Sequence, residues 1–258
     1  MTESTHAAPG VRDVVIVGGG PAAHRLADSL HARDADRTLR VTVVGEELHE
    51  PYDRVALSTR LADAAADLTL QPSSMWDDEH IRLVTGERVV AVDPVAHTAT
   101  TSGGLALHWD ELVLATGSSA PVPEIPGHQH ARVYRTIDDV DSLVAETRTL
   151  AQRHGRPARV VVAGGGLLGL EAAGGLAKLG AHAAVVHSGG WLMSAQLDEG
   201  AGRALGRIIA GQGIGLHLGT RPAAVLVEDD AVVGVELTNG RTNRDRPRGL
   251  RHRHQPAR

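Results

Sequence analysis

The chain contains no cysteine and no phenylalanine, and aromatic residues make up only 2% of its 258 residues. Without cysteine, the chain has no disulfide, no thiolate ligand for an iron–sulfur cluster and no redox-active dithiol. With so few aromatic side chains, a core has to be built from Val, Leu and Ala. Such a core suits parallel strands that are buried on both faces. We therefore expect an α/β protein.

Long apolar runs are also missing. No segment approaches the roughly 20 apolar residues of a membrane-spanning helix, and the N-terminus does not resemble a signal peptide. We therefore expect a cytoplasmic protein with no membrane partner. Of the fifteen histidines, those in the body of the chain are scattered, and the cluster His252-Arg253-His254 lies in the arginine-rich segment, so we assign no metal site.

The charge is unevenly distributed along the chain. The net charge is −5, yet residues 241–258 hold seven Arg and one Asp. That segment carries about +6, so the remainder carries about −11. An acidic body of this kind argues against nucleic acid as the main partner.

One stretch organises the second half of the chain. The β-branched run Val160–Val162 leads into Gly164-x-Gly166-x-x-Gly169 and then into a helical pattern. This order of strand, turn and helix is the setting of the dinucleotide-binding fingerprint. Gly164 permits the tight turn, Gly166 lets the backbone approach a pyrophosphate, and Gly169 lets helix and strand pack closely. The free N–H groups at the helix start would bind the phosphates.

A second copy of the fingerprint lies near the N-terminus. The run Val14–Val17 precedes Gly18-x-Gly20-x-x-Ala23, with Ala as a tolerated third residue. The next expected strand, Leu39–Val44, ends at two acids, of which Glu46 is our first choice and Glu47 our second to accept hydrogen bonds from a ribose. A plain βα connection is the alternative interpretation of such a turn. Two nucleotide sites in one chain would imply electron transfer between two cofactors.

Between the fingerprints the pattern predicts several smaller elements. We expect an antiparallel hairpin or meander over 81–101, a buried strand over 109–117 that breaks at Thr116-Gly117, and a helix over 133–154. Arg54 and Ser58 would either face a cofactor or form a surface salt bridge and a helix cap; composition favours neither.

After the second fingerprint we expect a strand over 183–187, a short run over 214–218 and a hairpin over 224–237. The strand over 183–187 ends at His187 rather than at an acid. Residues 1–10 are expected to be disordered. The arginine-rich segment from residue 241 is interpreted as a disordered tail, as an anion-binding arm, or as a segment encoded out of frame or past a truncation.

Several motifs together resemble those of the flavin-dependent pyridine nucleotide reductases. Within that family, the sequence is most similar to the N-terminal part of the large subunit of NADH-dependent nitrite reductases. The stretches that carry this resemblance are GGGPAAHRLADSL, PYDRVALS, LVLATGSSAPVPEIPG, YRTIDDVDSL and VVVAGGGLLGLEAAGGLAKLGAHAAVVHSGGWLMSAQLD.

The resemblance implies two Rossmann-like dinucleotide-binding domains, truncated at the C-terminus. These would be an incomplete FAD-binding domain at 11–122, a connecting segment at 123–156 and an NAD(P)-binding domain at 157–240 that lacks its last strand. A disordered arginine-rich tail at 241–258 would follow.

The resemblance also implies the cofactors and their residues. NADH is expected rather than NADPH, because no Lys or Arg occurs from Ala181 to Gly202 to bind a 2′-phosphate. Glu171, expected in the first turn of its helix, would face the nicotinamide as the catalytic candidate, or would only be a favourable acid near a helix N-terminus. FAD would be bound by Gly18, Gly20, Ala23 and Glu46 with Arg54, Thr116 and Gly117 beside it, and NADH by Gly164, Gly166 and Gly169.

Relatives of this kind continue into a further strand, a segment that completes the flavin site, and a siroheme and iron–sulfur portion. We therefore expect an electron-input module that passes electrons from NADH through FAD to a metal centre outside this chain. The alternatives are a stand-alone ferredoxin or rubredoxin reductase, or an inactive nucleotide-binding fragment. Because part of the flavin pocket would be missing, we expect the isolated chain to bind FAD weakly or not at all.

Overall fold

The computed structural model describes residues 10–244. The expected disordered leader and most of the arginine-rich tail lie outside these residues. The described chain divides into two compact units. The first contains the residues up to Leu57 together with Ala65–Ser119, and the second contains Ser58–Ala64 and the residues from Ala120 onward.

The first unit is built on a parallel sheet with the strand order β3-β2-β1-β7. Each neighbouring pair in this sheet is parallel, so the carboxyl ends of all its strands meet at one edge. The strands are β1 (Arg12–Val17), β2 (Leu39–Val44), β3 (Ile81–Val84) and β7 (Glu111–Leu114).

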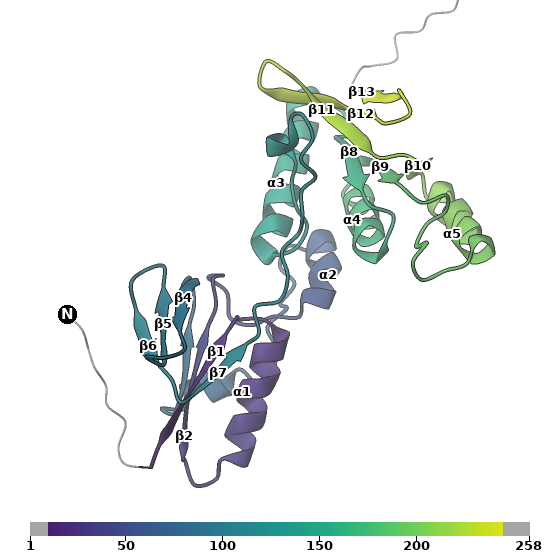
Figure 1. Ribbon diagram of the computed structural model, residues 1–258. Coiled ribbons are helices and arrows are strands. Elements are labelled where there is room, and N and C mark those ends of the chain that lie inside the picture. The colour runs from purple at the N-terminus through teal and green to yellow at the C-terminus, as the bar shows by residue number, and fades with distance from the viewer. Residues whose placement is uncertain (1–9, 245–258) are drawn as a thin grey trace, which may run out of the picture. The chain divides into compact units, whose positions relative to one another are not determined.

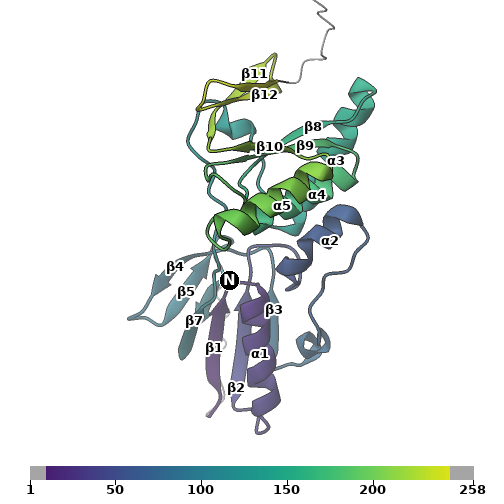
Figure 2. The ribbon, with the colours of Figure 1, turned by 90° about the vertical axis from the view of Figure 1, so that its right-hand side faces the viewer.

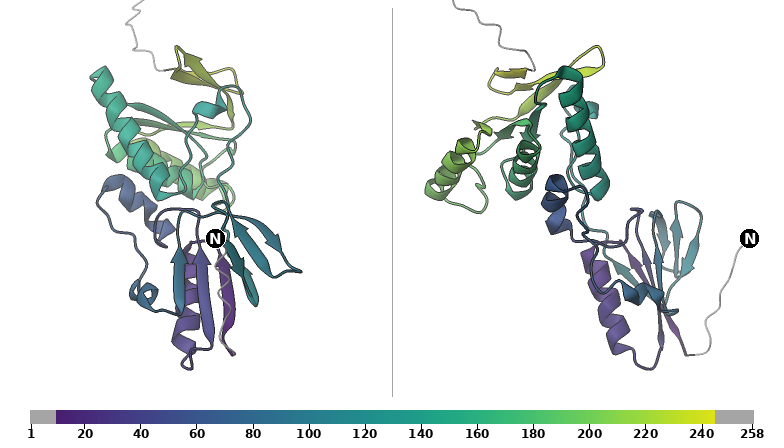
Figure 3. Two further views of the ribbon diagram at one scale, coloured as in Figure 1. Left: turned by 90° about the vertical axis from the view of Figure 1, so that its left-hand side faces the viewer. Right: turned by 180° about the vertical axis from the view of Figure 1, so that it is seen from behind.

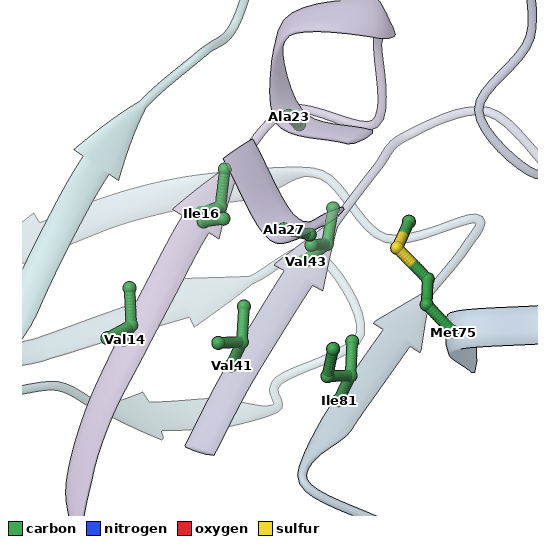
Figure 4. Packing of buried hydrophobic residues seen from close by; sticks show 8 residues of the cluster. All are labelled: Val14, Ile16, Ala23, Ala27, Val41, Val43, Met75 and Ile81. Carbon is green, nitrogen blue, oxygen red and sulfur yellow. The ribbon is translucent and has the colours of Figure 1, made fainter. Parts of the chain in front are cut away.

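Helix α1 (Pro21–Arg33) covers one face of this sheet (Figure 1). Figure 4 shows how small helix side chains make this contact possible, because Ala23 and Ala27 meet the strand residues directly. Both alanines are fully buried. The cluster that they form contains Val14, Ile16, Val41, Val43, Met75 and Ile81. The core is thus built from small aliphatic residues, as the scarcity of aromatic residues predicts.

The opposite face of the sheet is covered by an antiparallel meander. Its strands are β4 (Val89–Asp93), β5 (Thr98–Thr101) and β6 (Ala106–His108), in that order. Ala99 and Leu107 of the meander pack against Val15 and Val17 of β1. The first unit therefore has three layers: helix, parallel sheet and meander.

The expected hairpin over 81–101 is wrong in its first part. Ile81–Val84 forms β3 and pairs in parallel with β2, with Val41 opposite Ile81. Only residues from Val89 onward form the antiparallel meander. The sequence of a short alternating strand does not show with which strand it will pair. Here the partner is β2, a parallel strand with a buried apolar face.

The second unit contains another parallel sheet, with the order β10-β9-β8. Helix α4 packs on β8 and β9, and α5 contacts β10; Figure 2 shows both helices beside this sheet. The elements are β8 (Arg159–Ala163), α4 (Leu167–Lys178), β9 (His182–His187), α5 (Glu199–Gly211) and β10 (Gly215–Leu218). The mixed α/β architecture confirms the predicted fold class.

Helix α3 (Ile137–His154) begins with a capping box. The Thr136 hydroxyl accepts the Asp139 N–H at 3.1 Å, and the Asp139 carboxylate accepts the Thr136 N–H at 2.9 Å. Gly155 ends the helix in a left-handed conformation. Arg60 of the short helix α2 (Leu57–Ala62) pairs with Asp141 of α3 at 2.9 Å. The segment Ser58–Ala64 thus belongs to the second unit through its contacts.

Helix α5 was not predicted, because four glycines interrupt its sequence EGAGRALGRIIAG. The structure explains them through close packing. A Cβ on Gly202 would lie 2.2 Å from the Trp191 ring, so only glycine fits there. Asp198 caps the helix by accepting the Ala201 N–H at 2.8 Å, and the Trp191 indole donates to the Leu197 carbonyl at 3.0 Å. The Trp191–Asp198 motif is therefore a structural loop.

A separate antiparallel sheet follows β10 (Figure 3). It consists of β11 (Pro222–Glu228), β12 (Ala231–Leu237) and β13 (Thr242–Arg244). Because Glu236 pairs with Thr242, the ordered structure continues past the expected boundary at residue 240. A disordered tail was expected from residue 241, and this prediction is wrong for Thr242–Arg244, which form a strand. Composition alone does not show that a polar segment can pair with an existing edge.

The two units share their order of elements but differ at one strand. In the first unit β1 has neighbours on both sides, β2 and β7. In the second unit β8 pairs with β9, and within residues 10–244 no strand pairs with its other edge. Four residues of β1 are buried and none of β8 is. The second edge of β8 therefore has no strand partner among the described residues.

The remaining short elements are three 3₁₀ turns, η1 (Arg54–Ala56), η2 (Ser74–Asp77) and η3 (His128–His130). No helix within the described part of the chain is long and apolar enough to span a membrane.

Candidate nucleotide-binding sites

The first glycine-rich turn lies where the carboxyl ends of β1, β2 and β7 meet. Gly18 has φ of +118°, and a Cβ there would lie 2.1 Å from the Ala115 carbonyl oxygen. Only glycine permits this close approach. The turn is therefore adjacent to Thr116 and Gly117, both exposed at the end of β7. The structure thus brings together, at one edge of the sheet, Gly18, Thr116 and Gly117, three of the residues predicted to lie beside FAD.

The start of α1 provides unpaired N–H groups. Gly20 is the N-cap residue and has no side chain to accept a hydrogen bond from the first turn. The atom nearest to a Cβ built on Gly20 is Nε of Arg54, at 3.8 Å. Free amides, the positive end of the helix dipole and a guanidinium group thus lie together, which is the chemistry that binds a phosphate.

Ala23, the third residue of the first fingerprint, has a different role from Gly18 and Gly20. Its side chain is fully buried against the sheet. It allows α1 to approach the strands closely and contributes packing at the site.

The two acids after β2 have different partners. Glu47 accepts a hydrogen bond from the Tyr52 hydroxyl at 2.6 Å and forms an ion pair with Arg54. Glu46 is exposed and pairs with Arg88 at 2.7 Å. The partly buried Glu47 therefore holds the loop that carries Arg54, whereas the exposed carboxylate of Glu46 pairs with Arg88.

Arg54 is part of a compact cluster on this loop. Its guanidinium lies 5.0 Å from the centroid of the Tyr52 ring, as well as beside Glu47. The expected alternative of a salt bridge is thus realised, and the same arrangement fixes Arg54 next to Gly20. The residues of the first unit fit a dinucleotide: uncapped amides for the pyrophosphate, a cation beside them and an outward carboxylate for the ribose.

The second glycine-rich turn repeats this geometry. Gly164 has φ of +129°, and a Cβ on Gly169 would lie 2.1 Å from the Gly164 carbonyl oxygen. Gly166 is the N-cap of α4 without a side-chain cap, and a Cβ there would meet nothing within 4 Å. Open space above uncapped amides fits a second pyrophosphate.

Glu171 is the fifth residue of α4, so its expected place in the first turn is wrong. It lies beside Tyr134, whose hydroxyl is buried and has no hydrogen-bond partner among the described residues. Burial and the negative charge of Glu171 raise the pKa of Tyr134 to about 12. No hydrogen bond joins the Glu171 carboxylate to this hydroxyl, so the effect of Glu171 on Tyr134 is one of charge alone.

His187 ends β9 and turns back onto the glycine-rich turn. Its Nδ1 accepts the Gly165 N–H at 3.2 Å, and its Nε2 lies 3.2 Å from the Ser194 hydroxyl. Gly165 and Ser194 were not predicted to belong to the site, because nothing in the local sequence indicates these contacts. No three His, Asp or Glu side chains within residues 10–244 gather in a way that would hold a metal ion.

The fold and both glycine-rich turns agree with the comparison with known families. The chain belongs to the pyridine nucleotide-disulphide oxidoreductase family, which matches residues 12–246. This chain has no cysteine, so it supplies no redox disulfide of its own.

The chain is also similar to individual proteins within this family. The chain is 39% identical over 207 residues to the nitrite reductase [NAD(P)H] large subunit of Klebsiella oxytoca, covering 79% of this chain and 21% of that protein. It is 34% identical to the nitrite reductase [NAD(P)H] of Bacillus subtilis, covering 90% and 28%. It is 33% identical to the ferredoxin–NAD(+) reductase component of an anthranilate 1,2-dioxygenase system from Burkholderia cepacia, covering 90% and 56%.

Among solved structures, the chain is similar to a ferredoxin reductase from Rhodopseudomonas palustris, with a TM-score of 0.78 and 30% identity. That likeness covers 90% of this chain and 56% of the other. The chain thus spans between about a fifth and about three fifths of the length of these relatives.

Proposed function

We propose that this chain is the NADH-oxidising, FAD-binding input module of a nitrite reductase-like flavoprotein. The observation that carries the proposal is the repeated arrangement of two glycine-rich turns, each followed by an uncapped helix N-terminus at the carboxyl edge of a parallel sheet. The family membership and the nitrite reductase relatives support it.

In this proposal the first unit holds FAD. The amides at the start of α1 bind the pyrophosphate, and Arg54 adds a positive charge beside Gly20. Glu46 accepts hydrogen bonds from the adenosine ribose, and the Thr116-Gly117 end of β7 closes the floor of the site. When bound, a flavin takes a hydride from a reduced nicotinamide and releases the electrons singly.

The second unit holds NADH. The amides after Gly166 bind its pyrophosphate, while Gly164 and Gly169 keep turn and helix close enough for that contact. Glu171 accepts a hydrogen bond at the nicotinamide end. NADH is preferred over NADPH, because residues 181–202 contain no Lys or Arg to neutralise a 2′-phosphate.

The electron acceptor lies outside this chain. Since the chain has no cysteine, it has no thiol of its own to receive the electrons. A siroheme and iron–sulfur domain or partner is the acceptor proposed here. The similarity to ferredoxin–NAD reductases supports a second candidate, a protein that reduces a separate ferredoxin or rubredoxin.

Titration of the purified chain tests the proposal. FAD and NAD⁺ are added separately in calorimetry, up to concentrations that reveal weak binding. We expect NAD⁺ to bind and FAD to bind only weakly, because part of the flavin pocket is expected to lie outside this chain. Gly18→Val should weaken FAD binding only, and Gly166→Val should weaken NAD⁺ binding only. Failure of both nucleotides to bind, or a loss of both with either variant, contradicts the assignment of one nucleotide to each unit.

Electron transfer is tested on the same sample. The chain saturated with FAD is mixed with NADH under anaerobic conditions, and flavin absorbance is followed in the visible range. Bleaching faster than that of free FAD supports an input module. Binding of both nucleotides without faster bleaching identifies an inactive nucleotide-binding fragment instead.

Addition of an acceptor separates the two active candidates. The reduced flavin is then reoxidised by the added acceptor. Reoxidation by a ferredoxin or rubredoxin, in a sample with less than one bound flavin per chain, favours the stand-alone reductase. Reoxidation only by a siroheme and iron–sulfur protein favours the nitrite reductase-like module.

A further inference from the structure

One edge of the parallel sheet in the first unit has no strand partner within residues 10–244. β3 is the outermost strand of the order β3-β2-β1-β7 and pairs only with β2 (Figure 2). The His80 carbonyl accepts the Val41 N–H, and the Val84 carbonyl accepts the Gly45 N–H, both at 2.8 Å. Because alternate residues of a parallel strand bond to the same neighbour, Leu83 directs its N–H and C=O away from β2, to the open edge.

A groove with a volume of about 690 Å³ lies along this edge. Its lining residues belong to β3, to the η2 turn with the residues that follow it, and to the loop after β2. Leu48, whose exposed fraction is 78%, and Trp76 form the apolar part of its wall. The groove has the volume of an ordinary ligand-binding site and borders backbone groups that can pair with an extended segment.

The groove is lined mainly by negative charge. Four of its ten lining residues are acids, and only one, Arg82, is basic. Of these acids, Asp78 alone pairs with an arginine in the part of the chain that the structure describes, namely Arg37 at 2.6 Å. The other three acids are exposed and have no arginine or lysine partner there: Glu50, Asp77 and Glu79. A segment that binds in this groove should therefore carry positive charge.

The end of the same chain has the complementary charge. Residues 245–258, which lie outside the described range, contain five Arg and one Asp, a formal charge of about +4. Pro247 and Pro256 enclose the eight residues RGLRHRHQ, which include no proline, so each of them has an N–H to donate to a neighbouring strand. At about 3.3 Å per residue, an extended run of this length covers about 26 Å. That is twice the length of β3, which has four residues.

We propose that residues 248–255 of this chain bind along the free edge of β3 as an added strand, with Leu250 in the groove and the arginines against its acids. Main-chain hydrogen bonds to Leu83 supply affinity, and the opposite charges select this segment. The contact also covers an edge that is otherwise open to pairing with other chains. The proposal is independent of nucleotide binding, since it uses no residue of either glycine-rich turn.

Disulfide formation between introduced cysteines tests the proposal in the full chain. Because the chain has no cysteine of its own, Leu48→Cys with Leu250→Cys creates a single possible pair. The control is Val95→Cys with Leu250→Cys, since Val95 lies between β4 and β5 of the same unit and its exposed fraction is 92%. We expect the Leu48 pair to oxidise at least about tenfold faster than the control pair, in a product with the mass of one chain.

Two results of this experiment overturn the proposal. Equal rates for the two pairs would mean that the acids only protect the free edge from pairing. A product with the mass of two chains would assign the groove to a second copy. The same measurement in 1 M salt tests the charges, because the Debye length falls to about 3 Å from about 10 Å at 0.1 M. The rate of the Leu48 pair should fall toward that of the control, and an unchanged rate contradicts the role given to the acids.

An exchange of charges between groove and segment tests their pairing directly. Asp77→Lys with Glu79→Lys, added to the Leu48 pair, should slow oxidation to the control rate. Further addition of Arg251→Glu with Arg253→Glu should restore the fast rate, because opposite charges then face each other again. A loss that these changes do not restore contradicts the proposal. The salt measurement needs no lysine substitution, so it decides the case in which the lysine variant does not fold.

Discussion

Two glycines on the same helix provide a sharp test of the packing around the second turn. Gly169 and Gly174 both lie in α4, so Gly→Ala gains helix propensity of about 0.5–1 kcal/mol at either position. Their surroundings differ completely. A Cβ on Gly174 meets nothing within 4 Å, whereas one on Gly169 lies 2.1 Å from the Gly164 carbonyl oxygen.

The expected effects have opposite signs. Gly174→Ala should stabilise the protein by the propensity gain alone. In Gly169→Ala, helix and turn must separate by about 1 Å to reach normal contact, at an overpacking cost of about 1–3 kcal/mol. Because the propensity gain is the same at both positions, the two variants should differ by the overpacking cost alone, about 1–3 kcal/mol in free energy of unfolding.

Urea denaturation followed by far-ultraviolet circular dichroism measures this difference. NAD⁺ titration gives a second measure, because separation of α4 from the turn displaces the amides proposed to bind the pyrophosphate. We expect Gly174→Ala to keep wild-type affinity and Gly169→Ala to lose it. Equal stabilisation by both variants would refute the argument from the close approach of Gly169 to Gly164.

Two further predictions concern α3 and the segment before it. Thr136→Ala removes the hydroxyl of the capping box and should lower the free energy of unfolding by about 1 kcal/mol, measured in urea, while Thr136→Ser should retain most of it. The raised pKa of Tyr134, about 12 against 10 for the unfolded group, favours its neutral form. That contribution is complete below pH 10 and is lost as the pH rises from 10 to 12. Tyr134→Phe should therefore reduce the loss of stability between pH 9 and pH 11, and an unchanged loss would show that Tyr134 does not titrate in this way.

Local sequence signals were sufficient for the elements whose conformation depends on near neighbours. The strand Leu39–Val44 was predicted with its observed bounds. The glycine-rich turns were recognised because positive φ and close backbone approach demand glycine at fixed spacing. The end of α3 followed from Gly155, which adopts the left-handed conformation that terminates a helix.

Elements that depend on distant partners were predicted less well. The sequence of α5 contains the glycines that normally weaken a helix, and only the contact of Gly202 with Trp191 explains them. The polar strand Thr242–Arg244 exists because β12 offers an edge. In both cases the element depends on a contact with a residue or strand outside the segment, so its own sequence pattern does not predict it.

The candidate sites also combine features set by the local sequence with features set by distant contacts. The sequence by itself determined that two glycine-rich turns exist, because their geometry requires particular glycines within a few residues. The tertiary structure alone decided how the neighbouring side chains are used. Folding of the loop after β2 joined Glu47 to Arg54, and parallel pairing of β8 with β9 brought His187 against Gly165. Register and loop contacts link residues on separate elements, so they are fixed only when the sheet has formed.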